Sequence, residues 1–243
     1  MKVGDTALGR PHRDSCCGEN GSTGHRHYTP LVAVDTSVGR IIADTRDHAV
    51  GLSTFLHCPY DQDVVEEALG HLDRLLPQGL HIRERIVVEV GANIGTTTLV
   101  FVQSCDARRV IALEPSPTVA PLLRATLALN GVTERVSVHK VAAGDRAVPA
   151  LLETSSVNFG DKLRGAGALL RSGVPVIAEY WPYALQRSGG LETFEAQVRA
   201  HFGAIYDVRS RPRGGTLLPS EEVASLRDQY SERLAYTDLD PSS

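Results

Sequence analysis

The chain has 243 residues, 42% of them hydrophobic, which suits one α/β domain with additional segments. Its 25 Lys and Arg and 29 Asp and Glu give a formal net charge of −4. Since no Lys/Arg-rich block occurs, the sequence argues against nucleic acid as the main partner. The longest apolar runs have the length of strands, so no membrane-spanning helix is expected.

Residues 1–29 are polar, Gly-rich and aperiodic, and this composition predicts a mobile tail. The segment lacks the apolar centre of a secretory signal, so a cytoplasmic location is expected. Cys16 and Cys17 are adjacent, a spacing that fits neither a disulfide framework nor a metal site, and no metal is expected.

Residues 30–80 form a lead-in segment before the main domain. Leu31 to Ala43 reads as two short strands around a Ser-Val-Gly turn, which predicts a hairpin. Asp63 to Leu76 carries apolar residues at helical spacing and predicts an amphipathic helix that packs on a sheet.

The stretch from Arg85 to Pro115 organises the rest of the chain. Ile86 to Val90 is a β-branched run broken only by Glu89, which predicts a strand covered on both faces. A glycine turn, a helix from Thr96 to Gln103 and a second strand from Arg109 to Leu113 follow. This order is a right-handed βαβ unit, whose ligands bind beyond the carboxyl ends of the strands.

The remaining segments continue the alternation of helices and strands up to a polar end. Helices are expected at 118–130, 166–171, 191–202 and 220–234, and strands at 136–141, 174–180 and 204–208, with a short strand at Leu151-Leu152 and a polar tail from Thr237 to Ser243. We therefore expect a main domain over 81–239 and a terminal tail over 240–243.

The glycine turn limits which nucleotide cofactor can bind. A dinucleotide site requires a middle glycine where this chain has Asn93, which disfavours an NAD-dependent oxidoreductase. A P-loop requires a Gly-Lys-Ser/Thr sequence, which does not follow here. The chain instead offers an acid, two glycines four residues apart and a second acid: Glu89, Gly91, Gly95 and Glu114.

This pattern suits a nucleoside with a cationic, phosphate-free tail, which describes S-adenosylmethionine. Glu89 can face the methionine ammonium, and amides between Asn93 and Thr96 can meet its carboxylate. Gly91 leaves room for the ribose and sulfonium, and Glu114 can accept bonds from the ribose hydroxyls. The plainer alternatives are that the glycines only make a turn and that Glu114 is a solvated strand end. Glu89 is harder to explain this way, since a buried carboxylate needs a partner.

With these residues in place, the chain resembles the FkbM family of S-adenosylmethionine-dependent methyltransferases. The resemblance is carried by the segments VVEVGANIGTTTLVF, IALEPSP, LLRATLALNG, VHKVAAGD, VNFGD and GAGALLRSGVPVIAEYWPYAL. It implies a Rossmann-like class I methyltransferase fold, a three-layer α/β sandwich with a mostly parallel sheet. It also implies methylation of a hydroxyl on a small-molecule or glycoside acceptor. Glu89, Gly91, Asn93 and Gly95 match the first cofactor motif, Glu114 the ribose motif, and Ala142 and Ala143 the adenine-contacting segment.

The chain departs from this family where a central strand with a D-x-x-G-x-E context is expected. Asn158 to Gly165 joins the flanking segments almost directly, so the chain resembles an internally shortened member. Three outcomes are open for the bare edge of the strand Ile86–Val90. It pairs with Val174–Tyr180, it pairs with Leu151-Leu152, or it stays open and favours association with another chain.

The acceptor side is therefore less well defined than the cofactor side. The candidates for a general base are Glu179, Asp161 and His139, chosen from residues near the expected pocket. Two functions follow from the sequence: a methyltransferase, or a shortened pseudo-enzyme that keeps the fold or the cofactor site without turnover.

Overall fold

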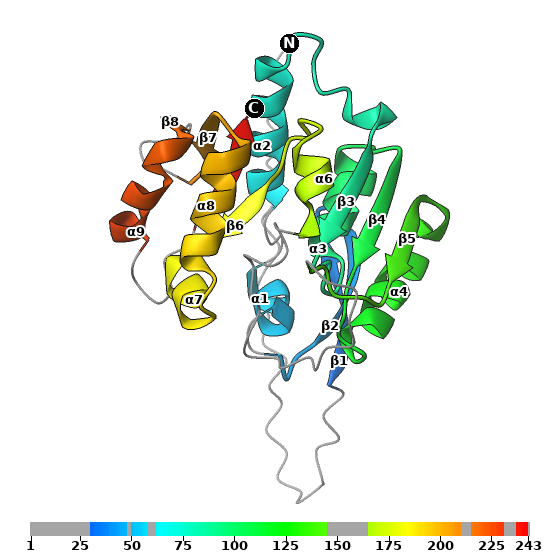
Figure 1. The fold of residues 1–243 in the computed structure, drawn as a ribbon. Coiled ribbons are helices and arrows are strands. Elements are labelled where there is room, and N and C mark those ends of the chain that lie inside the picture. Colours follow the sequence, from blue (N-terminus) through cyan, green and yellow to red (C-terminus); the bar gives the residue numbers. More distant parts are fainter. Residues whose placement is uncertain are drawn as a thin grey trace, which may run out of the picture.

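The computed structural model describes residues 30–47, 50–57, 62–144, 165–209, 215–230 and 237–242. In these residues the strands form a two-stranded hairpin, a three-stranded sheet and a four-stranded sheet. The two larger sheets lie on either side of helix α2, with the hairpin below the first of them in the view of Figure 1.

The N-terminal half contains the hairpin and the parallel sheet. Its elements are β1 (Leu31–Thr36), β2 (Gly39–Asp44), α1 (Val50–His57), α2 (Gln62–Leu75), η1 (Ile82–Glu84), β3 (Ile86–Val90), α3 (Thr96–Leu99), η2 (Val100–Ser104), β4 (Arg109–Leu113), α4 (Val119–Leu129), η3 (Thr133–Arg135) and β5 (Val136–His139). The predicted hairpin, the amphipathic helix and the three strands are thus confirmed, and the third strand is two residues shorter than expected.

The C-terminal half contains the antiparallel sheet and its helices. Its elements are α6 (Gly167–Leu170), β6 (Ala178–Tyr180), α7 (Pro182–Arg187), α8 (Leu191–His201), β7 (Ala204–Asp207), β8 (Thr216–Pro219), η4 (Ser220–Ser225), α9 (Leu226–Gln229) and β9 (Thr237–Ser242).

Strands β3, β4 and β5 pair in parallel in that order, with Val87 opposite Val110 and Val110 opposite Val136. Right-handed crossovers place the connecting helices on the same face of the sheet. On that face Val110 and Ala112 are fully buried, in one core with residues of η2, α4 and the hairpin. The α/β fold with a Rossmann-like parallel unit, predicted from the sequence, is confirmed.

The hairpin is attached to the parallel unit through α4. The Ile42 N–H donates to Thr126 Oγ1 at 3.0 Å, and the Arg40 N–H donates to Asn130 Oδ1 at 2.8 Å. Asn130 Nδ2 also donates to the Arg40 carbonyl at 2.6 Å. These bonds satisfy the outer edge of β2, so the lead-in segment and the parallel unit form one body.

Helix α2 packs against both halves of the molecule. Val65 belongs to the core of the parallel unit, whereas Val64 and Ala68 pack with Tyr206 and Val208 of the second half. On the same helix, the ring of His71 stacks on Tyr206 with centroids 3.5 Å apart.

The second sheet has the order β6-β9-β7-β8 and is antiparallel throughout. The polar end of the chain, expected to lie outside regular structure, forms β9, the strand between β6 and β7, so that expectation was wrong for 237–242. Alternating polar residues such as Asp238 and Asp240 hide a strand from a pattern based on hydrophobicity.

The buried carboxylate of Glu195 joins α8 to β6 and α9. Glu195, with no exposed surface, accepts from Tyr180 Oη at 2.8 Å and from Arg227 Nε and Nη2 at 2.6 Å each.

One expectation about the organising strand was also wrong, and one of the three outcomes left open for its edge is excluded. Strand β3 is covered on one face only, since Ile86, Val88 and Val90 are 55%, 47% and 42% exposed. The connecting helices α3 and α4 do not cover that face, because both crossovers return on the other one. The segment 174–180 forms a strand only over Ala178–Tyr180, and this strand pairs with β9 rather than with β3. Leu151-Leu152, the tail 1–29 and Asp161 lie outside the described residues.

In the part of the chain that the structure describes, no helix is long and apolar enough to cross a membrane.

Candidate functional site

The turn after β3 adopts a backbone that only certain residues tolerate. Gly91, Asn93 and Gly95 have φ values of 82°, 50° and 95°, in the region where glycine is unstrained and asparagine is the best-tolerated alternative. The N–H groups of Gly91 and Ala92 both donate to the Leu113 carbonyl, at 2.8 and 3.1 Å. These bonds hold the turn against the carboxyl end of β4.

Gly95 also allows a close approach between the turn and α4. A Cβ at this position would lie 2.8 Å from Leu123 Cδ1, closer than carbon atoms can pack. The second glycine of the motif therefore has a packing role beside any cofactor role, as one of the plainer interpretations allowed.

Glu114, at the end of β4, is turned into this site rather than into solvent. Its side chain is 7% exposed and accepts from the Asn93 N–H at 2.9 Å and the Ser116 N–H at 2.8 Å. The alternative that Glu114 is only a solvated strand end is thus excluded. The bond from the Asn93 backbone N–H corrects another expectation. Because this N–H already donates to Glu114, it is not open to the carboxylate of a ligand. A carboxylate has about four lone-pair sites, so each oxygen of Glu114 can accept one more hydrogen bond.

Glu89 points to the covered face of the sheet and accepts from Thr98 Oγ1 of α3 at 2.6 Å. Burial raises its pKa from 4.5 to about 7, the Thr98 bond opposes this shift, and the nearby charge of Glu114 adds to it. A carboxyl group in this state is half protonated near neutral pH. A cation beside it would favour the ionised form.

The turn therefore brings together acceptors that can take further donors. Asn93 Oδ1 is buried and has no hydrogen-bond partner among the described residues. Glu114 has two open acceptor positions, and Glu89 carries an ionisable group whose charge is unbalanced. Ribose hydroxyls and an ammonium group are donors, and an ammonium or sulfonium supplies positive charge. The residues present fit S-adenosylmethionine in donor pattern and in charge.

The other predicted site residues in the described part of the chain lie on elements other than the turn after β3. Ala142 and Ala143 follow the carboxyl end of β5, at the same edge of the sheet as Gly91 and Glu114. His139 ends β5 opposite Leu113 with an exposed ring, and its carbonyl accepts from the Glu114 N–H at 3.0 Å. Glu179 lies on β6 in the other sheet. In the described segments no group of three His, Cys, Asp or Glu residues is suited to a metal ion.

Two contributors were missed by sequence reasoning. Thr98 lies nine residues after Glu89, and only the helical turn of α3 brings its hydroxyl to the carboxylate. Ser116 donates its N–H to Glu114, and its Oγ accepts from the Val119 N–H at 3.2 Å at the start of α4. The serine two residues after Glu114 and shortly before a helix was a usable signal, because serine commonly caps helices.

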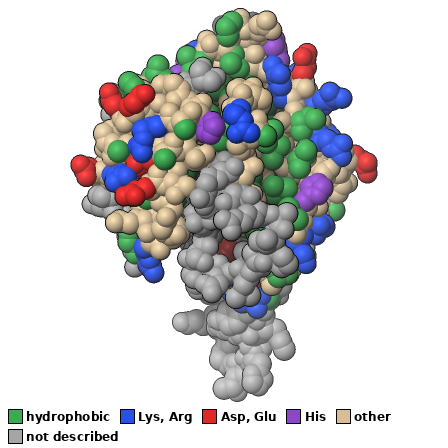
Figure 2. All heavy atoms as spheres, viewed as in Figure 1, with side chains coloured by type: hydrophobic (Ala, Val, Ile, Leu, Met, Phe, Trp, Pro, Cys, Tyr) green, Lys and Arg blue, Asp and Glu red, His purple; other side chains and the backbone are tan. Residues whose placement is uncertain are grey.

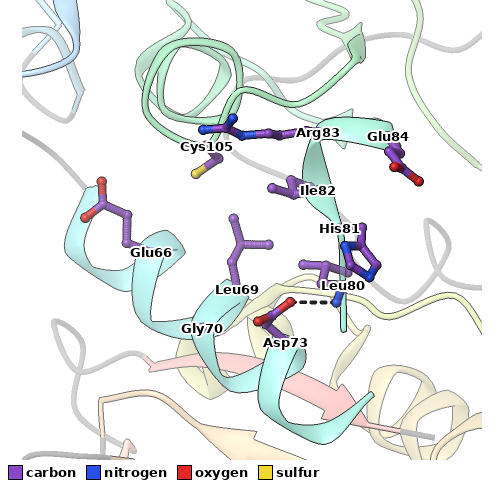
Figure 3. A pocket seen from close by; sticks show the side chains of 10 residues that line it. All are labelled: Glu66, Leu69, Gly70, Asp73, Leu80, His81, Ile82, Arg83, Glu84 and Cys105. Carbon is purple, nitrogen blue, oxygen red and sulfur yellow. Dashed lines mark hydrogen bonds between the residues drawn. The ribbon is translucent and has the colours of Figure 1, made fainter. Parts of the chain in front are cut away.

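A cavity of about 470 Å³ opens at the amino end of β3, away from these residues (Figure 3). It lies between α2, η1 and Cys105, and its wall is held by a bond from the Leu80 N–H to Asp73 Oδ1 at 2.7 Å. Burial and Glu66 raise the pKa of the Cys105 thiol to about 11, so this thiol is protonated and unreactive at neutral pH. No predicted site residue lines this cavity.

Comparisons with known proteins concern the fold. No protein-family profile and no curated protein matches the chain. Among solved structures, TYW2 from Pyrococcus horikoshii, in complex with MeSAdo, is 16% identical with a TM-score of 0.49 over 88% of this chain and 72% of its own. A geranyl diphosphate methyltransferase in complex with SAM is 15% identical with a TM-score of 0.46 over 91% and 100%. The methyltransferase FkbM from Methylobacillus flagellatus is 17% identical with a TM-score of 0.39 over 49% and 38%.

Proposed function

We propose that the turn after β3 binds S-adenosylmethionine and that the protein is a methyltransferase derived from a shortened FkbM-like chain. The observation that carries this proposal is the meeting of Glu89, Glu114 and the unpartnered Asn93 Oδ1 at the carboxyl ends of β3 and β4. Three acceptors, two of them acidic, need a ligand that is cationic and rich in donors.

Each residue has a separate role in this proposal. Glu114, already oriented by two backbone N–H groups, accepts from the ribose hydroxyls through its remaining lone pairs. Glu89, held by Thr98, faces the ammonium group, and Asn93 Oδ1 accepts one further donor. Gly91 leaves the backbone open to the cofactor, and Ala142 and Ala143 border the adenine. When bound, S-adenosylmethionine supplies an electrophilic methyl group.

For the acceptor we propose a hydroxyl on a sugar or another small molecule. The protein must align that hydroxyl with the methyl group and remove its proton, so a base near the sheet edge is required. Of the sequence candidates, His139 lies at the carboxyl edge of the parallel sheet with an exposed ring. Glu179 lies in the other sheet, and Asp161 is outside the described residues.

A second candidate function is cofactor binding without turnover. In the described residues no strand pairs with the outer edge of β3, where the family resemblance implies a strand that helps build the acceptor site. A chain without that strand can keep the cofactor half of the site and lose the acceptor half.

A calorimetric titration of the full chain with S-adenosylmethionine tests the cofactor site. We expect saturable binding to one site, weakened by Glu114→Ala and unchanged by Glu134→Ala, which removes an exposed acid of η3. A folded protein that gives no heat of binding would refute the proposal. Formation of S-adenosylhomocysteine with a panel of hydroxylated acceptors then separates the enzyme from the binding protein.

A further inference from the structure

The hydroxyl of Thr98 has a choice of acceptors. Thr98 is the third residue of α3 and has no exposed surface, so its hydroxyl must find a partner inside the protein. A threonine in a helix can donate to the carbonyl four residues back, which here belongs to Ile94. Thr98 Oγ1 donates instead to Glu89 Oε2 at 2.6 Å, a length typical of a hydrogen bond from a hydroxyl to an ionised carboxylate. The bond is therefore strongest when Glu89 is ionised.

The other two threonines of α3 do not share this role. Successive residues of a helix point about 100° apart, so one of three consecutive side chains can face a given strand. Of Thr96, Thr97 and Thr98, only Thr98 bonds to Glu89. Thr97 is half-buried, which makes it a matched control on the same helix.

The Thr98 bond also decides which carboxylate oxygen is left for a ligand. Oε2 of Glu89 is engaged by Thr98, whereas Oε1 has no hydrogen bond to any residue that the structure describes. Glu89 is half-buried and Thr98 is fully buried, so the side of the carboxylate that faces away from Thr98 is the accessible one. Oε1 is thus the oxygen that can meet a cation.

Among the described residues, no cation balances Glu89 on the covered face of the sheet. The turn after β3, α3 and η2 carry no ionisable side chain. Glu114, at the end of β4, adds a negative charge that favours the protonated form of Glu89, and Glu66 of α2 lines the cavity at the amino end of β3. The cations on other elements of this core bond elsewhere: Arg40 to Asp35, Arg46 to Asp44, Arg109 to Ser137 and Arg124 to the Val138 carbonyl.

The uncovered face of β3 is apolar. Side chains alternate along the strand, so this face carries Ile86, Val88 and Val90. Figure 2 shows hydrophobic side chains gathered over the region of β3 and β4 on this side of the sheet. The Thr98 hydroxyl is therefore the described group that favours the ionised form of Glu89.

We propose that Thr98 is a positioning residue of the cofactor site: it keeps Glu89 ionised, turns Oε1 toward the ligand and so sets the lowest pH at which the site binds a cation. This inference rests on the proposed binding of S-adenosylmethionine. Protonation of Glu89 removes the charge that attracts the ammonium group, and loss of the Thr98 donor favours protonation. Without the hydroxyl, cofactor binding should be lost at a higher pH than in the wild-type protein.

Titration of the cofactor-free full chain tests the effect of Thr98 on Glu89 without any ligand. NMR of protein labelled at its glutamate carboxyl carbons follows Glu89, whose signal is identified by its loss in Glu89→Gln. Thr98→Val keeps the shape of the side chain but removes the donor, and it should raise the pKa of Glu89 from about 7 by roughly one unit. Thr98→Ser keeps the donor and should leave this pKa close to that of wild type. Thr97→Val should not change it.

Calorimetry with S-adenosylmethionine at several pH values tests the consequence for the site. With pKa values of about 7 and about 8, the ratio of wild-type to Thr98→Val affinity should fall from roughly tenfold at pH 6 to roughly twofold at pH 8, because Glu89 becomes ionised in both proteins. Both proteins bind the same ligand, so titration of the ligand itself cancels from this ratio. A residue that only packs α3 on β3 would give a ratio that does not change with pH.

The role of Thr98 would be overturned by an unchanged pKa of Glu89 in Thr98→Val, by an equal shift in Thr97→Val, by a serine variant that behaves like the valine variant, or by an affinity ratio that is constant with pH. A different result separates this inference from the proposed function. If the titration follows the expectation but the wild-type chain does not bind S-adenosylmethionine, the proposed function fails, and with it the cofactor role of Thr98, although the bond still controls the charge of Glu89.

Discussion

Replacing Glu89 by glutamine should stabilise the fold at alkaline pH while removing the charge that we propose for cofactor binding. The pKa of Glu89 is raised from 4.5 to about 7, because folding buries the carboxyl group beside Glu114. Keeping it ionised in the folded state costs up to about 3 kcal/mol, from 1.36 kcal/mol for each pKa unit. Glutamine carries no charge and can still accept from Thr98 Oγ1, so it avoids this cost.

The sign of the pH dependence follows from the direction of the shift. Below pH 4.5 Glu89 is protonated in both the folded and unfolded states, and the variant has no advantage. As pH rises from 4.5 to 7 the wild-type protein loses stability relative to Glu89→Gln, and above pH 7 the difference is constant. Urea unfolding of both proteins, measured between pH 5 and 8, gives the difference directly. If the variant is equally stable or less stable than wild type at pH 8, the claim that folding raises the pKa of Glu89 is refuted.

Three further substitutions test other parts of the structure. Glu114→Ala should weaken S-adenosylmethionine binding by about 1–3 kcal/mol, seen by calorimetry, because it removes charge-assisted hydrogen bonds; an unchanged affinity would show that Glu114 does not hold the ribose. Gly95→Ala should lower the free energy of unfolding by roughly 1–3 kcal/mol, because its Cβ would lie 2.8 Å from Leu123 Cδ1 at φ 95°. Gly144→Ala, with nothing within 4 Å, is the control for this packing effect and should be neutral. Glu195→Ala should destabilise the C-terminal half by about 3 kcal/mol in thermal or urea unfolding, because Arg227 and Tyr180 lose their buried partner; a loss below 1 kcal/mol would contradict this role.

The turn after β3 and the position of Glu114 beside it could be predicted because their signals are local. The order strand, glycine turn, helix and strand forces Gly91 and Glu114 to the same edge of the sheet, whatever the rest of the chain does. The presence of a half-buried acid at Glu89 also followed from its place in an apolar run. What it bonds to did not, because the Thr98 hydroxyl reaches it only through the geometry of α3.

The C-terminal half was harder to predict because its arrangement depends on distant pairings. Nothing within Thr237–Ser242 indicates a strand, and the segment forms β9 because β6 and β7 offer edges on either side of it. The apolar run of β3 was likewise typical of a strand covered on both faces. Local sequence cannot show whether another part of the chain supplies the second cover, and here Val88 stays exposed.

The most direct test of the cofactor proposal is the affinity for S-adenosylmethionine as a function of pH, measured for wild type and Glu89→Gln. If the ionised carboxylate of Glu89 faces the cation, wild-type affinity should be constant above about pH 7 and fall by up to tenfold for each pH unit below it. The variant should bind more weakly above pH 7 and show no such dependence. Binding by wild type that does not change between pH 5.5 and 8, or a variant that follows the same curve, would contradict the account.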